Sequence, residues 1–430
     1  MKEKYGITLL VCIISLALAP IAHATNGDNL IGIGPASRAM GGVGIAAPQD
    51  AIGAVFANPA AMCFSEYCPS SEFNFASTLF APKVEAKITS ASGTVKAKSQ
   101  DNIYPIPAIG ISVPMGDKLP DWRFGLAAYG VSGLGVDYKG TDLENNAFYD
   151  FGPGGQFPLA SGTFTQLQIM KFAPSVAWQA SDQWALGLAV HVSYATLDLQ
   201  DGSAPGYAVG VQPGVIYKPT DAISLGLNYI TPQSVTHKNV TDFDQDGEWD
   251  DLELEAPQQL GFGAAYEFSQ GKFLLEGNIK WINWSNAAGY SDFDWEDQWV
   301  FAIGGQYRAT ESWILRAGYN YGANPVKEHN GWDGSVGPGG PNSVTTVQGK
   351  TIPTYYYETF RTIGFPAVVE HHVTLGAEYR VSDSFFISLG GMYAFENNIK
   401  EKGTDLFGQD VTLESTLQEF GLDLGFTWRF

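Results

Sequence analysis

The sequence is short of cysteine and of basic residues, and each shortage excludes a class of protein. Only three of the 430 residues are cysteine, and no second Cys or His pair accompanies them, which argues against a zinc site. Lys and Arg number 24 against 45 Asp and Glu, which gives a formal net charge of −21 at pH 7. Nucleic-acid binding requires basic patches. We therefore expect no nucleic-acid partner.

Catalytic motifs are absent as well. The sequence contains no G-x-S-x-G elbow, no P-loop, no H-E-x-x-H and no complete G-x-G-x-x-G. The adjacent His371 and His372 adjoin a predicted strand, so their side chains should point to opposite faces and cannot share a metal ion. We predict that the chain is not an enzyme and requires no cofactor.

A long apolar segment occurs only at the N-terminus. Lys2 and Lys4 precede an apolar run from Ile7 to Ala19, which ends at the small-x-small sequence Ala22-His23-Ala24. This is the pattern of a secretory signal peptide. The run is shorter than the roughly 20 residues that a membrane-spanning helix needs. We predict that residues 1–24 are a signal peptide and that the mature chain is exported.

Export bears on the two cysteines that the mature chain retains. Cys12 leaves with the signal peptide, whereas Cys63 and Cys68 remain. Two cysteines five positions apart in an exported chain form a disulfide or stay as free thiols. Both possibilities stay open at this point.

Apolar residues are plentiful in the mature chain, but polar residues alternate with them. Hydrophobic residues make up 45% and aromatic residues 13% of the sequence, with 50 glycines that disfavour helices. Alternation with a period of two predicts strands that have one apolar face. On the last such segment the apolar face is Phe420, Leu422, Leu424, Phe426, Trp428 and Phe430, and the other face is Gly421, Asp423, Gly425, Thr427 and Arg429.

The spacing of the strands predicts a transmembrane β-barrel over residues 69–430. Short turns alternate with mostly longer loops, which is the arrangement of outer-membrane barrels. Closure leaves no unpaired strand edge in lipid. We count 14 antiparallel strands, beginning near residues 71, 103, 121, 163, 184, 207, 222, 252, 272, 298, 312, 368, 384 and 416. An all-β, 14-stranded barrel in a bacterial outer membrane is the predicted fold.

Residues 25–68 do not alternate and precede the first strand. They are rich in small residues and helix breakers. A 14-stranded barrel encloses a lumen too wide for its wall side chains to fill. We predict that this segment forms a plug, or hatch, inside the lumen.

The plug carries the sharpest resemblance to a known family. Its motifs are Ser37-Arg38-Ala39-Met40-Gly41-Gly42, then Asp50-Ala51, then Asn58-Pro59-Ala60. Through these motifs the chain resembles the FadL/TodX family of outer-membrane channels for long-chain fatty acids and aromatic hydrocarbons. Three further segments share the resemblance: Gly133–Tyr138, Trp281–Ser285 and Tyr319–Val326. The resemblance covers nearly the whole mature chain. It implies passive uptake of hydrophobic small molecules, with the plug residues Ser37, Met40, Gly41, Asn58, Pro59 and Ala60 in gating.

The resemblance also implies where the substrate leaves. In that family the third strand kinks inward, and the substrate passes sideways through the wall into the outer-membrane lipid. The matching strand here runs from Trp122 to Tyr138 and contains Gly130, Gly133 and Gly135. Glycine inside a strand marks a bend, or else lets a neighbouring backbone approach closely. We expect the lateral opening at these glycines.

Members of the family often capture substrate on long third and fourth outer loops. Here the third loop, about Gln200 to Gly206, is short and the fourth is acidic. We therefore expect capture at aromatic residues of the second and sixth loops, unless these residues only hold the loops together. The candidates are Phe148, Phe151, Phe157, Tyr355, Tyr356 and Tyr357.

The acidic fourth loop matches a 12-residue calcium-binding pattern. Its acids stand at positions 1, 3, 5, 9 and 12, with Gly247 at position 6. The flanks read as strands rather than helices, and the other interpretation is a solvated acidic loop. The predicted ligands of a structural calcium ion are Asp242, Asp244, Asp246, Asp250 and Glu253.

A second class of function remains open from the sequence. A surface structural or adhesive barrel would use its long loops to bind a partner, and a polar porin is a weaker alternative. The plug favours a selective channel, since an adhesin needs no gated lumen. We also expect a monomer, and recognition of the C-terminal Phe430 by the barrel-assembly machinery.

Overall fold

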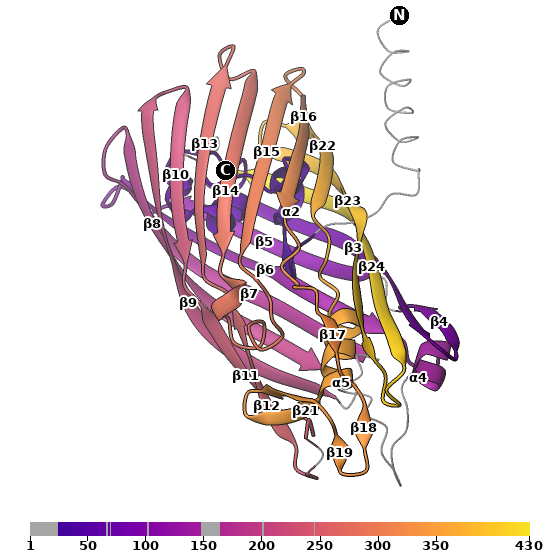
Figure 1. Cartoon of the computed structure of the whole chain (residues 1–430). Helices are drawn as coiled ribbons and strands as arrows, with labels where there is room; N and C mark the ends of the chain where they lie inside the picture. The colour runs from indigo at the N-terminus through magenta and orange to yellow at the C-terminus, as the bar shows by residue number, and fades with distance from the viewer. Residues whose placement is uncertain are drawn as a thin grey trace, which may run out of the picture.

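The structure, a computed structural model, describes residues 25–65, 68, 70–100, 103–147, 164–199, 202–244 and 246–430. The predicted signal peptide lies outside these residues. Fourteen antiparallel strands form a closed barrel, because β24 pairs with both β23 and β3 (Figure 1). They are β3 (Glu72–Ser90), β5 (Tyr104–Pro114), β6 (Trp122–Asp137), β7 (Phe164–Gln179), β8 (Trp184–Asp198), β9 (Ser203–Thr220), β10 (Ile223–Ile230), β13 (Gln259–Phe268), β14 (Phe273–Ile282), β15 (Gln298–Arg308), β16 (Trp313–Gly322), β22 (His371–Ser382), β23 (Phe385–Thr404) and β24 (Asp410–Arg429).

The predicted fold class and strand number are confirmed. One predicted strand is wrong: the segment near residue 252 is not part of the wall. It forms β12 (Asp250–Ala256), which pairs with β11 (Gln233–Thr241) in a separate two-stranded sheet. The eighth wall strand is β13 instead. The hairpin alternates apolar and polar residues as the wall does, so the periodicity of the sequence does not distinguish the two.

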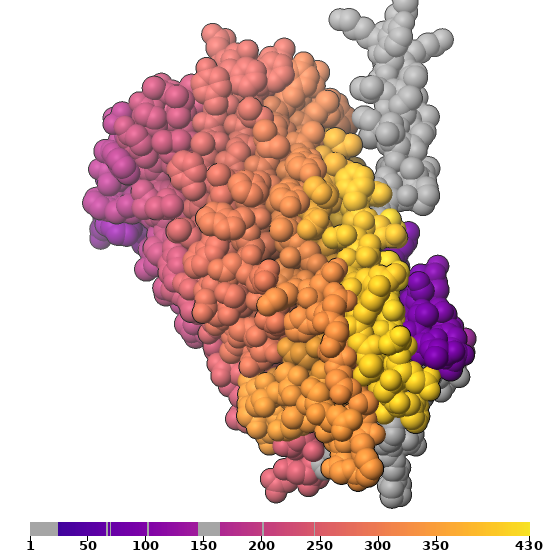
Figure 2. All heavy atoms as spheres, viewed as in Figure 1, coloured from indigo at the N-terminus to yellow at the C-terminus, as the bar shows by residue number. Residues whose placement is uncertain are grey.

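The wall strands follow from the period-two pattern. Along β8, Leu186, Leu188, Val190 and Val192 are exposed on the outer face while Ala185, Ala189 and His191 are buried. Figure 2 shows this outer face on one side of the barrel. Near the short-turn end, aromatic side chains stack across neighbouring strands, as in Trp184 with Tyr217, whose ring centroids are 4.4 Å apart. Such aromatic girdles belong at the membrane interface.

The N-terminal segment lies inside the barrel, at the end that carries the short turns (Figure 1). Its helices contact wall strands on several sides of the lumen, including β5 to β9 and β22 to β24. Nearly all of its residues are buried. Its elements are β1 (Thr25–Asn26), β2 (Asn29–Leu30), α2 (Gly34–Ala39), α3 (Ala51–Ala57) and the 3-10 helix η1 (Pro59–Cys63).

Wall glycines allow the plug backbone to touch the wall backbone. A Cβ at Gly187 on β8 would lie 2.1 Å from the backbone nitrogen of Ala60, and one at Gly226 on β10 would lie 2.1 Å from the carbonyl oxygen of Ile45. No other residue type leaves room for the plug at these two positions. The plug is therefore fitted to this wall rather than loosely held in the lumen.

Smaller elements fill the loop end of the barrel, opposite the plug. The elements at the loop end are β4 (Gly93–Lys98), α4 (Asp142–Ala147), β11, β12, η2 (Trp284–Asn286), β17 (Asn330–Trp332), β18 (Val336–Gly337), β19 (Gly340–Pro341), β20 (Val344–Val347), β21 (Lys350–Pro353), α5 (Thr354–Thr359) and the π-helix η3 (Phe360–Gly364). None of the helices in the described residues is long and apolar enough to cross a membrane.

Candidate functional site

The third wall strand, β6, contains a bulge. Gly130 pairs with Met170 and Ser132 pairs with Ile169, so Val131 is an extra residue in β6 relative to β7. An extra residue bends a strand away from its partner. On the other side, β6 pairs with β5 only from Arg123 to Tyr129.

Beyond Tyr129, β5 and β6 separate. The residues from Tyr104 to Pro107 of β5 pair with β3 alone, and among the wall strands those from Ser132 to Asp137 of β6 pair with β7 alone. Pro105 and Pro107 have no N–H group, so they cannot donate to a neighbouring strand. The wall therefore has a gap between its second and third strands.

An apolar cavity of about 250 Å³ occupies this gap. Pro105 and Pro107 line it and are also exposed, so the cavity reaches the outer face of the wall. It exceeds the roughly 150 Å³ apolar cavity that accepts benzene. We call it the wall cavity; its lining includes Leu30, Phe80, Ile106, Leu134, Leu167 and Pro366.

The three predicted glycines lie at this gap, but each does something different. A Cβ at Gly130 would lie 2.5 Å from Ile106 Cγ2 on β5, so Gly130 permits close approach where the strands part. A Cβ at Gly135 would lie 2.9 Å from the carbonyl oxygen of Thr165. Gly133 has no such neighbour closer than 3.8 Å. The bulge itself falls at Val131.

The β1–β2 hairpin of the plug blocks the inner side of the gap. Asn29 pairs with Ser132 on β6, and Leu30 lines the wall cavity. Asp28 Oδ2 accepts a hydrogen bond of 2.8 Å from Ser132 Oγ and another from Tyr290 Oη. Asp28 thus joins the plug, the bulge and an outer loop.

The first residue of the hairpin is fixed to wall strands on the other side of the gap. Thr25 Oγ1 donates to Glu419 Oε1 on β24 at 2.9 Å, and the Thr25 carbonyl accepts from His372 Nε2 on β22 at 3.0 Å. The turn at Gly27 has φ +62°, and a Cβ there would lie 2.8 Å from the Trp284 ring. The hairpin therefore makes polar contacts with β6 on one side of the gap and with β22 and β24 on the other.

A smaller, polar cavity of about 40 Å³ lies between the plug and the wall. Lys171 on β7 and Lys280 on β14 line it, and Leu30 lies between it and the wall cavity. Within the described residues, no carboxylate lies within 4.0 Å of either ammonium group. Asn26 also lines this cavity; it is 1% exposed, and neither of its side-chain polar atoms has a hydrogen-bond partner among those residues.

Unpaired polar atoms and buried charge are costly unless something compensates them. The polar cavity has room for about three water-sized groups, since one needs roughly 10–15 Å³. We call it the cationic cavity. Its chemistry suits a small anionic group beside an apolar chain.

Sequence reasoning missed Asp28, Lys171 and Lys280. A signal for the lysines exists, because each occupies a lumen-facing position of an alternating strand in a strongly acidic chain. Pro105 and Pro107 were likewise a readable sign of a broken strand pair. Asp28 offers no such signal, since nothing in the sequence shows which wall residues it meets.

The predicted gating residues of the plug hold it to the wall. Asn58 Nδ2 donates to the carbonyls of Ile45 and Val215 at 2.9 and 3.1 Å, and Asn58 Oδ1 accepts from Ala60 N at 3.2 Å. Pro59 follows as the first residue of η1. Asn58 is fully buried, as a firm anchor requires.

The α2 end of the plug is anchored in the same way. Gly41 N donates to Thr374 Oγ1 at 2.9 Å, and Gly41 O accepts from Asn320 Nδ2 at 3.0 Å. Ser37 Oγ donates within the plug, to the Val43 carbonyl at 3.2 Å. Met40 is buried against wall strands. Gating by these residues stays a prediction.

The predicted capture aromatics divide into two groups. Phe148, Phe151 and Phe157 lie outside the described residues. Tyr355, Tyr356 and Tyr357 are buried in α5, and the Tyr357 hydroxyl donates to the Asp292 carbonyl at 2.9 Å. In this structure the three tyrosines hold loops together and present no open groove.

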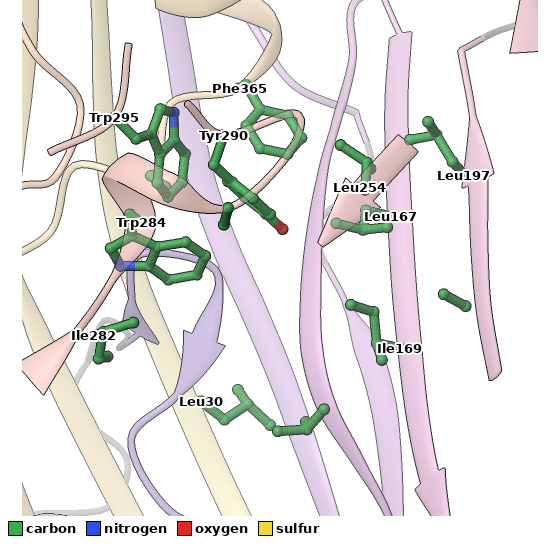
Figure 3. Packing of buried hydrophobic residues seen from close by; sticks show 14 of the residues in the cluster. Leu30, Leu167, Ile169, Leu197, Leu254, Ile282, Trp284, Tyr290, Trp295 and Phe365 are labelled. Carbon is green, nitrogen blue, oxygen red and sulfur yellow. The ribbon is translucent and has the colours of Figure 1, made fainter. Parts of the chain in front are cut away.

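An aromatic cluster connects these loops to the plug (Figure 3). Trp284, Tyr290 and Trp295 have ring centroids 4.6 to 5.1 Å apart, and Phe365 lies 6.1 Å from Tyr290. The Tyr290 hydroxyl reaches Asp28. Movement of the outer loops would therefore displace Tyr290 and, through its hydrogen bond, Asp28 of the plug hairpin.

The disulfide considered for Cys63 and Cys68 is not present; both are free thiols. Cys68 Sγ donates to the Met62 carbonyl at 2.9 Å rather than meeting Cys63. Burial raises the pKa of the Cys63 thiol to about 12. Disulfide formation proceeds through the thiolate, which this burial disfavours.

Three of the five predicted calcium ligands come together. Carboxylate oxygens of Asp242, Asp244 and Asp246 lie within 4.8 Å of one another. Asp250 instead pairs with Lys350 Nζ at 2.5 Å, and Glu253 lies within β12. Lys350 Nζ is also 3.8 Å from Asp244. The ammonium group of Lys350 thus occupies part of the predicted calcium site.

We predict that Lys350 competes with calcium at this loop. Replacing Lys350 with Met should increase the stabilisation that added calcium gives, because the three aspartates lose their cationic neighbour. Calcium titration with thermal melting measures this, with Asp244→Ala plus Asp246→Ala as the control. Equal stability with and without calcium in both wild type and Lys350→Met would rule out the site.

Comparison with known proteins agrees with this geometry. A family model described as "Outer membrane protein transport protein (OMPP1/FadL/TodX)" matches residues 15–204 and 195–332. No curated protein matches the sequence significantly.

Solved structures share the fold at low sequence identity. The Pseudomonas putida toluene transporter TodX is 18% identical, with a TM-score of 0.64 over 93% of this chain and 99% of that chain. A Pseudomonas aeruginosa FadL homologue is 15% identical, with a TM-score of 0.65 over 95% and 99%. The Ralstonia pickettii toluene transporter TbuX is 17% identical, with a TM-score of 0.61 over 93% and 99%.

Proposed function

Because the chain belongs to the OMPP1/FadL/TodX family of outer membrane transport proteins, we propose that it is a channel for passive uptake of hydrophobic small molecules. The observation that carries the proposal is the apolar wall cavity at the break between β5 and β6. An apolar molecule gains nothing from a water-filled pore. A side exit delivers it to lipid without crossing water.

Different parts of the structure would bind the substrate and close the gap. The wall cavity accepts the apolar part of the substrate, and the β1–β2 hairpin holds the inner side of the gap closed through Asn29 and Asp28. Leu30 lines both cavities, so its displacement would open a passage from the lumen to the gap. Diffusion down a concentration gradient drives the process, so neither catalysis nor a cofactor is needed.

The cationic cavity favours a substrate that carries a carboxylate. Lys171 and Lys280 offer ammonium donors next to an apolar space, and no carboxylate of the described residues lies within 4.0 Å of either, although the charge of Asp28 acts on Lys171. A fatty acid matches this pair of cavities, with its head at the lysines and its tail toward the gap. A neutral aromatic hydrocarbon would leave both lysines unpaired.

The test is uptake by cells that lack a channel of this kind. Labelled long-chain fatty acid, its methyl ester, an alkylbenzene and a small sugar are compared in cells with and without the protein. Faster uptake of the apolar probes with unchanged sugar uptake supports the channel. If a correctly inserted barrel changes none of them, the surface structural or adhesive barrel becomes the better interpretation.

We predict that Lys171→Met plus Lys280→Met lowers fatty acid uptake at limiting concentration by roughly tenfold or more, because a hydrogen bond to a charged group contributes about 1.5–3 kcal/mol. Alkylbenzene uptake should stay unchanged. Methionine fills a similar volume and removes the unpaired buried charge, so the barrel should still fold. The matched control is Lys238→Met, because Lys238 is an exposed lysine of β11 and lines neither cavity. Equal loss for both substrates would contradict carboxylate recognition.

We also propose that Phe430 is read by the barrel-assembly machinery and that the barrel acts as a monomer. The backbone nitrogen of Phe430 donates to the Ser71 carbonyl at 3.0 Å, so the last residue lies at the closing seam of the barrel. A wall of 14 strands closed on itself needs no second copy.

A further inference from the structure

A short helical segment of the sixth outer loop packs between two strands of the same loop and the wall strands β23 and β24. It comprises α5 and η3, Thr354 to Gly364, and every one of its residues is buried. Its contacts include β20 and β21 on one side and β23 and β24 on the other. Two residues after η3 the chain reaches Pro366, which lines the wall cavity.

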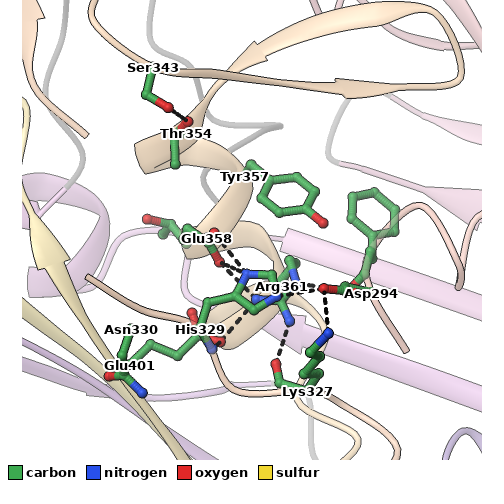
Figure 4. A network of polar contacts seen from close by, with 12 residues as sticks. Asp294, Lys327, His329, Asn330, Ser343, Thr354, Tyr357, Glu358, Arg361 and Glu401 are labelled. Atoms are coloured by element: carbon green, nitrogen blue, oxygen red, sulfur yellow. Dashed lines mark hydrogen bonds and ion pairs between the residues drawn. The ribbon is translucent and has the colours of Figure 1, made fainter. Parts of the chain in front are cut away.

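His329 fixes this segment to the neighbouring fifth loop (Figure 4). Its Nδ1 lies 2.9 Å from Glu358 Oε1 in α5, and its Nε2 lies 2.8 Å from Asp294 Oδ2. A carboxylate only accepts hydrogen bonds, so both ring nitrogens must carry a proton. The closed arrangement is therefore built around an imidazolium rather than a neutral imidazole.

Arg361 in η3 completes the attachment. Its Nη1 lies 2.8 Å from Glu358 Oε2 and 2.9 Å from Glu401 Oε1 on β23, and its Nε donates to the Phe293 carbonyl at 2.8 Å. The His329 backbone nitrogen also donates to Glu401 Oε1 at 3.0 Å. Loops five and six and the outer part of β23 thus meet in one polar network.

The network contains three groups that can carry a positive charge and three that can carry a negative charge. Lys327 Nζ lies 3.5 Å from Asp294 Oδ2, and the Tyr357 ring stacks on the imidazole with centroids 6.5 Å apart. The three cationic groups are Lys327, His329 and Arg361, and the three carboxylates are Asp294, Glu358 and Glu401.

Part of the interface is unsatisfied. Thr362 Oγ1 and Glu401 Oε2 are buried without a hydrogen-bond partner among the described residues. A partly satisfied polar network contributes less than a complete one. The segment is therefore held less firmly than the hydrogen-bonded wall behind it.

We propose that residues 354–364 are a lid at the side of the wall cavity that faces the outer loops and that protonated His329 latches this lid shut. The role of the lid rests on the proposed transport function, because it would admit substrate from outside. The existence of the latch does not depend on transport.

The sign of the pH dependence follows from the contacts of His329. The hydrogen bond to Glu358 raises the pKa of His329 above its ordinary value. The stabilisation of the closed lid is therefore complete below the ordinary value of about 6.5 and is lost as pH rises through the raised pKa. A neutral imidazole turns a lone pair toward one of the two carboxylates, which repels it. The lid should loosen in mildly alkaline surroundings.

Hydrogen exchange of the full-length protein in lipid vesicles measures this directly. We expect the protection factors of residues 354–364, already corrected for the intrinsic effect of pH, to fall between about pH 6 and about pH 9, because the latch is lost as His329 gives up its proton. Protection of the wall strands should stay constant. Lid protection that does not change with pH would overturn the proposal.

Two variants separate the latch from a general loss of structure. His329→Gln should give low lid protection that no longer responds to pH, whereas His371→Gln, an exposed histidine on β22 bonded to Tyr319, should behave as wild type. Asp294→Asn keeps His329 but removes one carboxylate, so its transition should move to lower pH. A His329→Gln protein that retains the wild-type pH response would refute the latch. Since transport is not measured, failure of the channel function would leave this result unaffected.

Discussion

Deletion of Val131 is expected to abolish uptake of apolar substrates while the barrel still folds. Val131 is the extra residue between Gly130, paired with Met170, and Ser132, paired with Ile169. Without it the two halves of β6 continue in one register against β7. A straight β6 can then run beside β5 and fill the wall cavity with its own backbone.

The measurement is uptake of the fatty acid and of the alkylbenzene, beside the heat-dependent gel mobility that reports a folded barrel. Uptake of both substrates should fall to the level seen in cells without the protein. Deletion of Gly339, whose surroundings are open, is the matched control for loss of one residue in a loop. Unchanged uptake by a folded barrel without Val131 would show that substrate does not leave at this gap.

Replacing Glu276 with Leu is expected to release the plug and open the barrel to ions. Glu276 on β14 accepts hydrogen bonds from the backbone nitrogens of Gly44, Ala46 and Ala47 at 3.0, 2.9 and 3.2 Å. Each buried N–H left without an acceptor costs about 1–3 kcal/mol. The plug segment has little core of its own to offset this loss, so it should detach locally.

Single-channel conductance in planar bilayers and cellular sensitivity to large antibiotics report the open lumen. Glu276→Gln keeps one acceptor oxygen and should show an intermediate conductance. Glu267→Leu, an exposed residue near a short turn of β13, should stay closed. A closed Glu276→Leu channel would mean that the wall glycines and Asn58 suffice to hold the plug.

The wall was predictable because each strand carries its own signal. The alternation of Phe420 to Phe430, for example, identifies one face as apolar without reference to any other strand. The same rule failed near Leu252, since a hairpin that covers the outer mouth also needs one apolar face. Period alone reports that a face is buried or in lipid, and it does not report which neighbour covers it.

The site was predictable only where backbone chemistry shows in the sequence. Gly130 and Gly135 lie on the strand that carries the bulge, and Pro105 with Pro107 could have marked its partner. The polar residues of the lumen were not predictable in the same way. Asp28 meets Ser132 and Tyr290, which are more than a hundred residues distant, and only the closed barrel brings them together.

The seam between β24 and β3 sets an order for assembly. It joins the two ends of the barrel segment through a register that runs from Val411–Ser90 to Arg429–Glu72, whereas other wall pairs join consecutive wall strands. Closing so long a loop is entropically the slowest step. The plug touches wall backbone at Gly187 and Gly226, where no side chain can yield. We expect the plug to settle against the curling sheet before the seam closes, and a chain that stopped before Asp410 to leave an open sheet.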